Sequence, residues 1–228
     1  RIRQGPGHLM EIELAGETLR LLPDKALYWP RQQTLFIADA HFGKVAAFRA
    51  AGIPLPPGST SAALARLTEC LAATGAKQLV FLGDFLHSRE GRAGPTFARF
   101  AAWRRQHDAI NIKLVRGNHD DRAGDPPPEW NIECVDEGEV VGPFCLSHHP
   151  EPDLRGYVLA GHIHPAIHLG GPAGDSLRLP CFWFGAYVCV LPAFGEFTGT
   201  YVVRPREGDR VFVAADGKVI ELGASREV

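Results

Sequence analysis

Apolar and polar residues alternate in short runs at the start of the chain. Residues 11–14 (EIEL), 18–23 (TLRLLP) and 26–30 (ALYWP) show the two-residue period of half-buried β-strands. Residues 15–17 (AGE) separate the first two runs and have the composition of a hairpin turn. The pattern therefore predicts strands joined by tight turns.

The pattern then changes to compact apolar runs separated by helical periods. We predict buried strands at residues 34–39, 78–84 and 111–118. A leucine stripe predicts a helix over 62–75 that ends at Gly75, and Pro95 opens a second helix over 95–107. A further helix is expected to begin at Lys44, and a proline-rich loop follows at 124–130.

The second half of the chain is dominated by strand-like runs. They cover residues 130–135, 139–149, 156–164, 177–185, 187–194, 198–203, 210–215 and 218–222. Strand–helix alternation followed by many strands predicts an α/β (α+β) fold with four αββα layers, in which helices flank two mixed β-sheets. We expect one domain over residues 10–228 and a tag or disordered extension over residues 1–9.

Composition and charge describe an ordinary globular chain. Of its 228 residues, 45% are hydrophobic and 22% are charged, and the formal net charge is −2. This balance gives no reason to expect strong electrostatic binding of nucleic acid. The five cysteines have no CxxC spacing, which favours buried thiols. Without a membrane-length apolar run or a signal-like start, we expect a cytoplasmic enzyme or binding protein without a membrane partner.

Polar, chemistry-bearing residues follow five of the predicted strands. They are Asp39 and His41, Asp84, Asn118 with His119 and Asp120, His148 with His149, and His162 with His164. Strand ends of an α/β sandwich converge on one crevice, and residues at i and i+2 of an extended backbone point to the same side. Buried carboxylates need cations, and a metal pair accepts this mixture of imidazole, carboxylate and amide.

Each motif alone is also what an ordinary polar turn looks like, so only the ordered set is informative. That set, D-x-H (39–41), G-D (83–84), G-N-H-D (117–120), H (148) and G-H-x-H (161–164), resembles the calcineurin-like metallophosphoesterases. Residues 38–44, 82–89, 147–151 and 179–200 resemble the bacterial DNA-ligase-associated subgroup, the DNA-damage-response endonucleases. The chain departs from that subgroup at Thr200, where a second glycine is usual.

The resemblance implies a calcineurin-like phosphoesterase fold and two divalent metal ions, with manganese first and iron or zinc as alternatives. It assigns Asp39, His41 and His164 to the first metal. It assigns Asn118, His148 and His162 to the second metal, and Asp84 to both. Between His148 and His149, the family position is the first, and strand alternation would point the two side chains to opposite sides.

The resemblance also makes His119 the catalytic histidine. A metal-bridging hydroxide would attack phosphorus while His119 protonates the leaving oxygen. Asp120 would orient the imidazole or raise its pKa, or would be a loop acid or helix cap. His87, Arg89 and His149 are candidate substrate-binding residues, with partly buried or solvated side chains as the alternative.

Three functions stay open at this point. The first is a DNA endonuclease or phosphodiesterase in DNA repair, with DNA as substrate and, by resemblance, DNA ligase and helicase partners. The second is a phosphoesterase for nucleotides or phosphomonoesters. The third is a non-catalytic, metal-bound repair scaffold. The presence of His119 beside a complete ligand set favours an enzyme, and the excess of arginine between His87 and Arg122 is compatible with a phosphate backbone.

Overall fold

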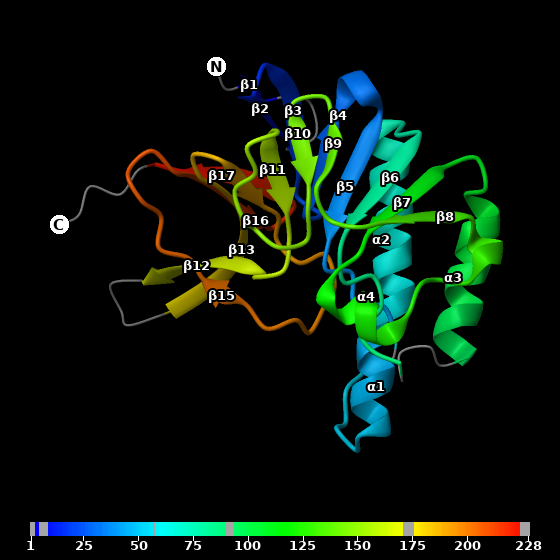
Figure 1. Ribbon diagram of the computed structural model, residues 1–228. Coiled ribbons are helices and arrows are strands. Elements are labelled where there is room, and N and C mark those ends of the chain that lie inside the picture. The colour runs from blue at the N-terminus through cyan, green and yellow to red at the C-terminus, as the bar shows by residue number, and fades with distance from the viewer. Residues whose placement is uncertain (1–2, 5–8, 57, 90–93, 171–175, 224–228) are drawn as a thin grey trace.

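The structure is a computed structural model that describes residues 3–4, 9–56, 58–89, 94–170 and 176–223. Its strands form two mixed β-sheets that share a hydrophobic interior (Figure 1). The predicted fold of two mixed sheets with flanking helices is confirmed.

The first sheet contains eight strands in chain order. They are β1 (Arg3–Gln4), β2 (Met10–Leu14), β3 (Glu17–Leu22), β4 (Ala26–Trp29), β5 (Thr34–Ala38), β6 (Gln78–Leu82), β7 (Asn111–Val115) and β8 (Ile132–Val135). Strands β1 to β5 pair in antiparallel fashion, whereas β5 to β8 are parallel. Parallel neighbours need crossover connections, and the helices supply them.

The described α-helices all lie in the segment that connects β5 to β8. They are α1 (Lys44–Ala50), α2 (Ser59–Thr74), α3 (Gly94–Gln106) and α4 (Asn118–Ala123), with short 3₁₀ turns η1 (Pro30–Gln32) and η3 (Pro128–Trp130). Helices were predicted at 62–75 and 95–107 and from Lys44, and all three are confirmed within a few residues. Among the described helices, none has both the length and the apolar character to cross a membrane.

The second sheet is built from the C-terminal half of the chain. Its strands are β9 (Glu139–Val141), β10 (Phe144–Leu146), β11 (Tyr157–Ala160), β12 (Pro165–Gly170), β13 (Ser176–Phe184), β14 (Val188–Val190), β15 (Tyr201–Val202), β16 (Arg210–Ala215) and β17 (Lys218–Leu222). The order β15-β12-β13-β14-β11-β10-β9 is extended by β16 and β17 beside β13. Strands β10, β11 and β14 are parallel neighbours.

The strand prediction for this half was wrong in two places. The run at 139–149 is not one strand, because Gly142, at φ +58°, turns the chain between the antiparallel strands β9 and β10. Strand β12 was not predicted, since its exposed outer half weakens the apolar pattern. Of the predicted extension 1–9, Arg3–Gln4 pairs with β2, whereas residues 1–2 and 5–8 lie outside the described part of the chain.

The hydrophobic core has two main layers. One layer packs α2 and α3 against the first sheet, and includes Leu67, Phe81 and Phe100. The other lies between the two sheets and includes Phe36 and Phe182. Strands β5 and β6 therefore have both faces covered, which explains why they read as continuous apolar runs in the sequence.

Candidate metal centre

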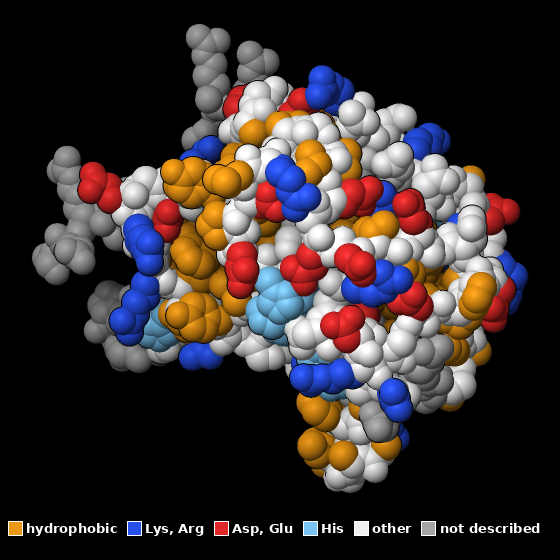
Figure 2. Space-filling view, viewed as in Figure 1, with side chains coloured by type: hydrophobic (Ala, Val, Ile, Leu, Met, Phe, Trp, Pro, Cys, Tyr) orange, Lys and Arg blue, Asp and Glu red, His pale blue; other side chains and the backbone are white. Residues whose placement is uncertain are grey.

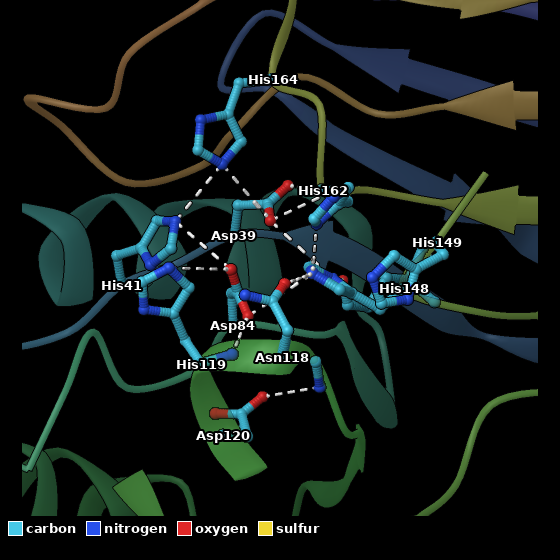
Figure 3. A network of polar contacts seen from close by, with 12 residues as sticks. Asp39, His41, Asp84, Asn118, His119, Asp120, His148, His149, His162 and His164 are labelled. Carbon is cyan, nitrogen blue, oxygen red and sulfur yellow. Dashed lines mark hydrogen bonds and ion pairs between the residues drawn. The ribbon is translucent and has the colours of Figure 1, made fainter. Parts of the chain in front are cut away.

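The C-terminal ends of five strands meet at one edge of the sandwich. In the first sheet β5, β6 and β7 are parallel, so their last residues lie side by side. In the second sheet β10 and β11 are parallel in the same way. The segments that follow these strands carry the predicted polar residues, and Figure 3 shows their side chains converging. The packing of the two sheets therefore assembles a single site from five distant parts of the sequence.

The first group of side chains consists of Asp39, His41 and His164. Their ligand atoms lie within 4.8 Å of one another. The Nε2 atoms of His41 and His164 are 3.3 Å apart, and His164 Nε2 is 3.5 Å from Asp39 Oδ1. These are the residues that the sequence assigned to the first metal.

The second group consists of Asn118, His148 and His162. His148 Nε2 lies 3.1 Å from Asn118 Oδ1 and 3.0 Å from His162 Nδ1. His148 is fully buried. These are the residues that the sequence assigned to the second metal.

Asp84 lies between the two groups. Its Oδ2 is 3.7 Å from His41 Nε2, and its Oδ1 is 3.4 Å from His148 Nε2. One carboxylate oxygen thus faces each group, which is the placement that a bridging ligand requires.

The ligand atoms of both groups are better placed to bind cations than to hydrogen-bond to one another. Carbonyl oxygens only accept hydrogen bonds, so Leu82 and Gly199 take the Nδ1 protons of His148 and His164, at 3.2 and 2.8 Å. Nε2 of His148 and of His164 is then unprotonated, and its lone pair points at other acceptor atoms. Asp39 and Asp84 are also buried, at 0% and 2% exposure, and buried carboxylates need positive charge nearby. The residues present therefore fit a pair of divalent cations with imidazole, carboxylate and amide ligands.

The pKa shifts of His41 and His162 favour the neutral imidazole that a metal ligand requires, whereas His164 shifts in the other direction. Burial lowers the pKa of His41 far below its ordinary value. Burial, followed by the nearby His148 and His149, also lowers the pKa of His162. For His164 burial acts in the same direction, but its interaction with Asp39 outweighs it and the pKa is raised.

The backbone at the site differs from the extended geometry assumed for the i, i+2 pairs. Strand β5 ends at Ala38, and β11 ends at Ala160, before the ligands begin. Asp39, His41, His162 and His164 have φ values of 53°, 46°, 74° and 51°. The paired residues do reach one site, but from left-handed loops and not from an extended strand.

Two glycines make room for ligands that come from other strands. A Cβ atom on Gly83 would lie 2.0 Å from His148 Nδ1, and one on Gly161 would lie 2.6 Å from Asp39 Oδ2. Gly83 also has a φ of +78°, a backbone conformation that residues with a side chain rarely adopt. These contacts explain the glycines in the G-D and G-H-x-H motifs.

His119 is at the start of α4 and lies beside Asp84. Its Nδ1 donates to the carbonyl oxygen of His87 at 2.5 Å, and its Nε2 is 3.9 Å from Asp84 Oδ2. The ring of His119 also stacks on that of His87, with centroids 5.1 Å apart. The carbonyl thereby fixes Nδ1 as a proton donor and leaves Nε2 facing the centre.

Asp120 caps α4, which is one of the two roles considered for it beside that of a partner of the His119 imidazole. Its carboxylate accepts hydrogen bonds from the backbone N–H groups of Gly117, Phe85 and Leu86, at 3.0, 3.3 and 3.2 Å. Burial raises the pKa of Asp120 to about 6, although these hydrogen bonds oppose the rise. The side chain thus ties the loop after β6 to the loop after β7, which is a role in positioning.

The three candidate substrate-binding residues lie in different surroundings. The ring of His87 lies edge-on to His41, with centroids 5.4 Å apart. Arg89 is exposed and donates to the carbonyl oxygen of Arg122 at 2.9 Å. His149 does not point away from the second group, because Ser147 to His149 lie beyond β10. Its ring centroid is 4.4 Å from that of His162.

Sequence reasoning missed two supports of the site. Glu137 accepts from His149 Nδ1 at 2.6 Å and from Ser147 Oγ at 2.7 Å, and so fixes the His149 ring. The segment after β14 bonds to the end of β5, with Phe194 N–H donating to Ala38 and Gly195 N–H to Asp39. No local pattern marks Glu137, whereas Gly195 falls in the 179–200 stretch of family resemblance.

The fold and this paired ligand set define a calcineurin-like phosphoesterase. The profile of that family, described as calcineurin-like phosphoesterase, matches residues 33–165, and the chain belongs to this family. It is a metal-dependent phosphoesterase, as predicted.

The chain is also similar to proteins of solved structure. The Pseudomonas putida nuclease MPE is 45% identical, with a TM-score of 0.84, over 94% of this chain and 100% of that chain. The protein of unknown function AQ665 from Aquifex aeolicus is 21% identical, with a TM-score of 0.39, over 57% of this chain and 78% of its own. YfcE, a phosphoesterase from E. coli, is 15% identical, with a TM-score of 0.41, over 83% and 97%. A comparison with curated proteins found no match.

Proposed function

We propose that this protein is a dinuclear-metal phosphodiesterase that hydrolyses DNA as an endonuclease. The observation that carries the proposal is the position of Asp84 between two complete ligand groups, each drawn from both sheets. The similarity to nuclease MPE over 94% of the chain supports a nucleic acid as the substrate, and the resemblance to the DNA-ligase-associated subgroup favours DNA.

The ligand groups define what each side chain does in this reaction. When bound, two divalent cations would lower the pKa of a water nucleophile and neutralise charge on the phosphate oxygens. Asp39, His41 and His164 would hold one of these cations, and Asn118, His148 and His162 the other. Asp84 would contact both and set their separation. Asn118 contributes a neutral oxygen, which limits the negative charge that the site must balance.

His119 is the proton donor for the leaving oxygen. Its Nδ1 is held by the carbonyl oxygen of His87, so the proton that can be transferred is on Nε2, on the side of Asp84. A deoxyribose alkoxide is a poor leaving group, and its departure depends on that proton. His149, held by Glu137 beside the second group, and His87 would contact the substrate phosphates, with Arg89 farther out on the surface.

The donor set and the family guide the finer assignments. Mixed imidazole and carboxylate ligands suit manganese, with iron and zinc as alternatives. By resemblance we place the protein in the cytoplasm, in DNA repair, with DNA ligase and helicase as partners. Residues 10–228 would form the single catalytic domain.

The test compares three substrates with metal-reconstituted protein. Purified protein is stripped of metal, reloaded with Mn²⁺, Fe²⁺ or Zn²⁺, and incubated with supercoiled plasmid, bis-p-nitrophenyl phosphate and p-nitrophenyl phosphate. We expect plasmid nicking and hydrolysis of the diester, with Mn²⁺ giving the highest rate.

Other outcomes would point to the other functions. Hydrolysis of the monoester alone would overturn the nuclease proposal and indicate a small-molecule phosphomonoesterase. Absence of turnover with every metal, in protein that retains two bound ions, would indicate a scaffold.

A further inference from the structure

Helix α1 and the turn that follows it form a projection beside the metal centre. We call residues 44–54 the α1 arm. It begins directly after the ligand His41 and extends away from both sheets, as Figure 1 shows. On the arm, the ring of Phe48 lies edge-on to His87, with centroids 5.6 Å apart. The arm is therefore continuous with the edge of the site.

The charge on this part of the chain is one-sided. Between Ala40 and Thr68 the sequence contains Lys44, Arg49 and Arg66 and no aspartate or glutamate, although the whole chain has a net charge of −2. Arg66 pairs with Glu196 at 3.3 Å, which leaves Lys44 and Arg49 as the positive charges of the arm. Burial lowers the pKa of Lys44, and the nearby carboxylates of Asp84 and Asp39 oppose this shift, so the side chain lies in the field of the metal centre. Arg49 is exposed one turn farther along the arm. Polyanions are attracted to such a surface.

The tip of the arm is apolar and faces solvent. Ile53 is 47% exposed, and Ala50, Ala51 and Pro54 beside it are exposed as well. Figure 2 shows hydrophobic side chains gathered at the end of this projection. A stable protein–protein interface buries about 800 Å² on each partner, which is far more than one isoleucine and a few small residues offer. The size of the tip suits a single base or sugar instead.

We propose that the α1 arm binds the nucleic-acid strand as it leaves the metal centre, with Arg49 on a backbone phosphate and Ile53 against a base or sugar. Arg49 lies about 7.5 Å along the helix axis from Lys44 and about 140° around it, so it would meet the strand at a point farther from the metal centre. This inference rests on the proposed nuclease function and adds the surface that guides its substrate.

The experiment compares Arg49→Glu and Ile53→Ser with the wild type in the metal-loaded, full-length protein. Arg105→Glu is the matched control, because Arg105 is exposed near the C-terminal end of α3, at the opposite end of the parallel strands. The substrates are a fluorescent DNA oligonucleotide and bis-p-nitrophenyl phosphate, which is too short to reach the arm. Each rate is measured over a range of salt concentrations.

We expect Arg49→Glu to lower kcat/KM on the oligonucleotide about tenfold, mainly through KM. The slope of log kcat/KM against log salt concentration should become shallower by about one unit, as expected for the loss of one phosphate contact. Ile53→Ser should lower kcat/KM on the oligonucleotide by a smaller factor without changing the salt dependence. Hydrolysis of the short diester should change less than twofold in both variants, and Arg105→Glu should match the wild type on both substrates.

Four results would overturn this inference. If the arm variants cleave the oligonucleotide as the wild type does, the arm does not guide DNA while the nuclease function stands. If both substrates lose activity equally, the arm supports the fold of the site instead of the strand. If the wild type cleaves no DNA, both proposals fail. A dimer in light scattering that Ile53→Ser converts to a monomer, with unchanged DNA kinetics, would assign the tip to self-association.

Discussion

Five of the seven predicted metal ligands adopt left-handed backbone conformations. They are Asp39, His41, Asp84, His162 and His164. Such a conformation costs a non-glycine residue about 1 kcal/mol or more, so the site carries roughly 5 kcal/mol of local strain. The rest of the fold must hold these residues in place, and cross-connections such as the bond from His162 N–H to Asp39 Oδ2, at 3.0 Å, do so. Strain concentrated on ligands is a residue-scale sign that the geometry serves chemistry.

The first residue-scale prediction concerns His119. We expect His119→Ala to keep both metals and to lose about 10²-fold or more in kcat on DNA, because the leaving alkoxide then lacks its proton donor. Loss on bis-p-nitrophenyl phosphate should be much smaller, since nitrophenolate leaves without protonation. Steady-state kinetics with metal analysis of the same samples measure both. Equal losses on the two substrates would count against the general-acid role.

A second prediction concerns the carboxylate that holds His149. Glu137→Ala removes this carboxylate and should free the imidazole of His149, which then binds the substrate less well. KM for the diester should therefore rise several-fold, with a smaller change in kcat. Asp136→Ala is the matched control, because Asp136 lies in the same turn but pairs with Arg116. Metal content should stay at the wild-type level in both. An unchanged KM in Glu137→Ala would show that His149 needs no fixed orientation.

At the scale of elements, the site was predictable where it follows the ends of apolar runs. Strands β5 and β6 are buried on both faces and β7 is buried at its C-terminal end, so the ends of these strands are clear in the sequence and the polar residues beyond them stand out. The ordered motifs then led to all seven candidate ligands, which the structure brings together. The alternation of strands and helices likewise predicted the layered fold.

What the sequence could not show depends on tertiary contacts or on loop conformation. The contact of Glu137 with His149 joins two turns and leaves no periodic pattern. Asp120 accepts hydrogen bonds from the backbone N–H groups of Phe85 and Leu86, and this link to a neighbouring loop goes beyond the helix cap that the sequence allowed for. The division of β9 from β10 depends on the turn at Gly142, which a continuous apolar run conceals.

The element-scale prediction tests the close approach of strand ends. In Gly83→Ala the new Cβ atom would meet the His148 ring at 2.0 Å, so the second ligand group should open and lose its metal. Gly16→Ala is the matched control, because Gly16 has nearly the same φ, +80° against +78°, with nothing within 4 Å of a Cβ atom. It should lose only about 1–2 kcal/mol of stability, the cost of the left-handed backbone. Metal analysis and thermal melts distinguish the two, and full metal content in Gly83→Ala would contradict this account.

At the scale of the whole molecule, each predicted metal joins the two sheets. The first group takes Asp39 and His41 from the end of β5 and His164 from beyond β11. The second takes Asn118 from beyond β7 and His148 and His162 from the other sheet. Metal bound by these residues would therefore connect the two halves of the chain across the sandwich, and the centre should contribute to stability as well as to catalysis.

Removal of metal should accordingly destabilise the whole protein. A ligand at 100 times its Kd adds about 2.7 kcal/mol to the free energy of unfolding, and each kcal/mol shifts Tm by about 2–4 °C in a chain of this size. Chelation should therefore lower Tm by about 5–10 °C, and re-addition of Mn²⁺ should restore it. His164→Ala should show a smaller shift, because one group is incomplete. His168→Ala should respond like the wild type, since His168 is an exposed residue of β12 that bonds to Ser176. A Tm that does not respond to verified removal of both metals would mean that the two sheets hold together without them, and that the ligand groups serve only the reaction.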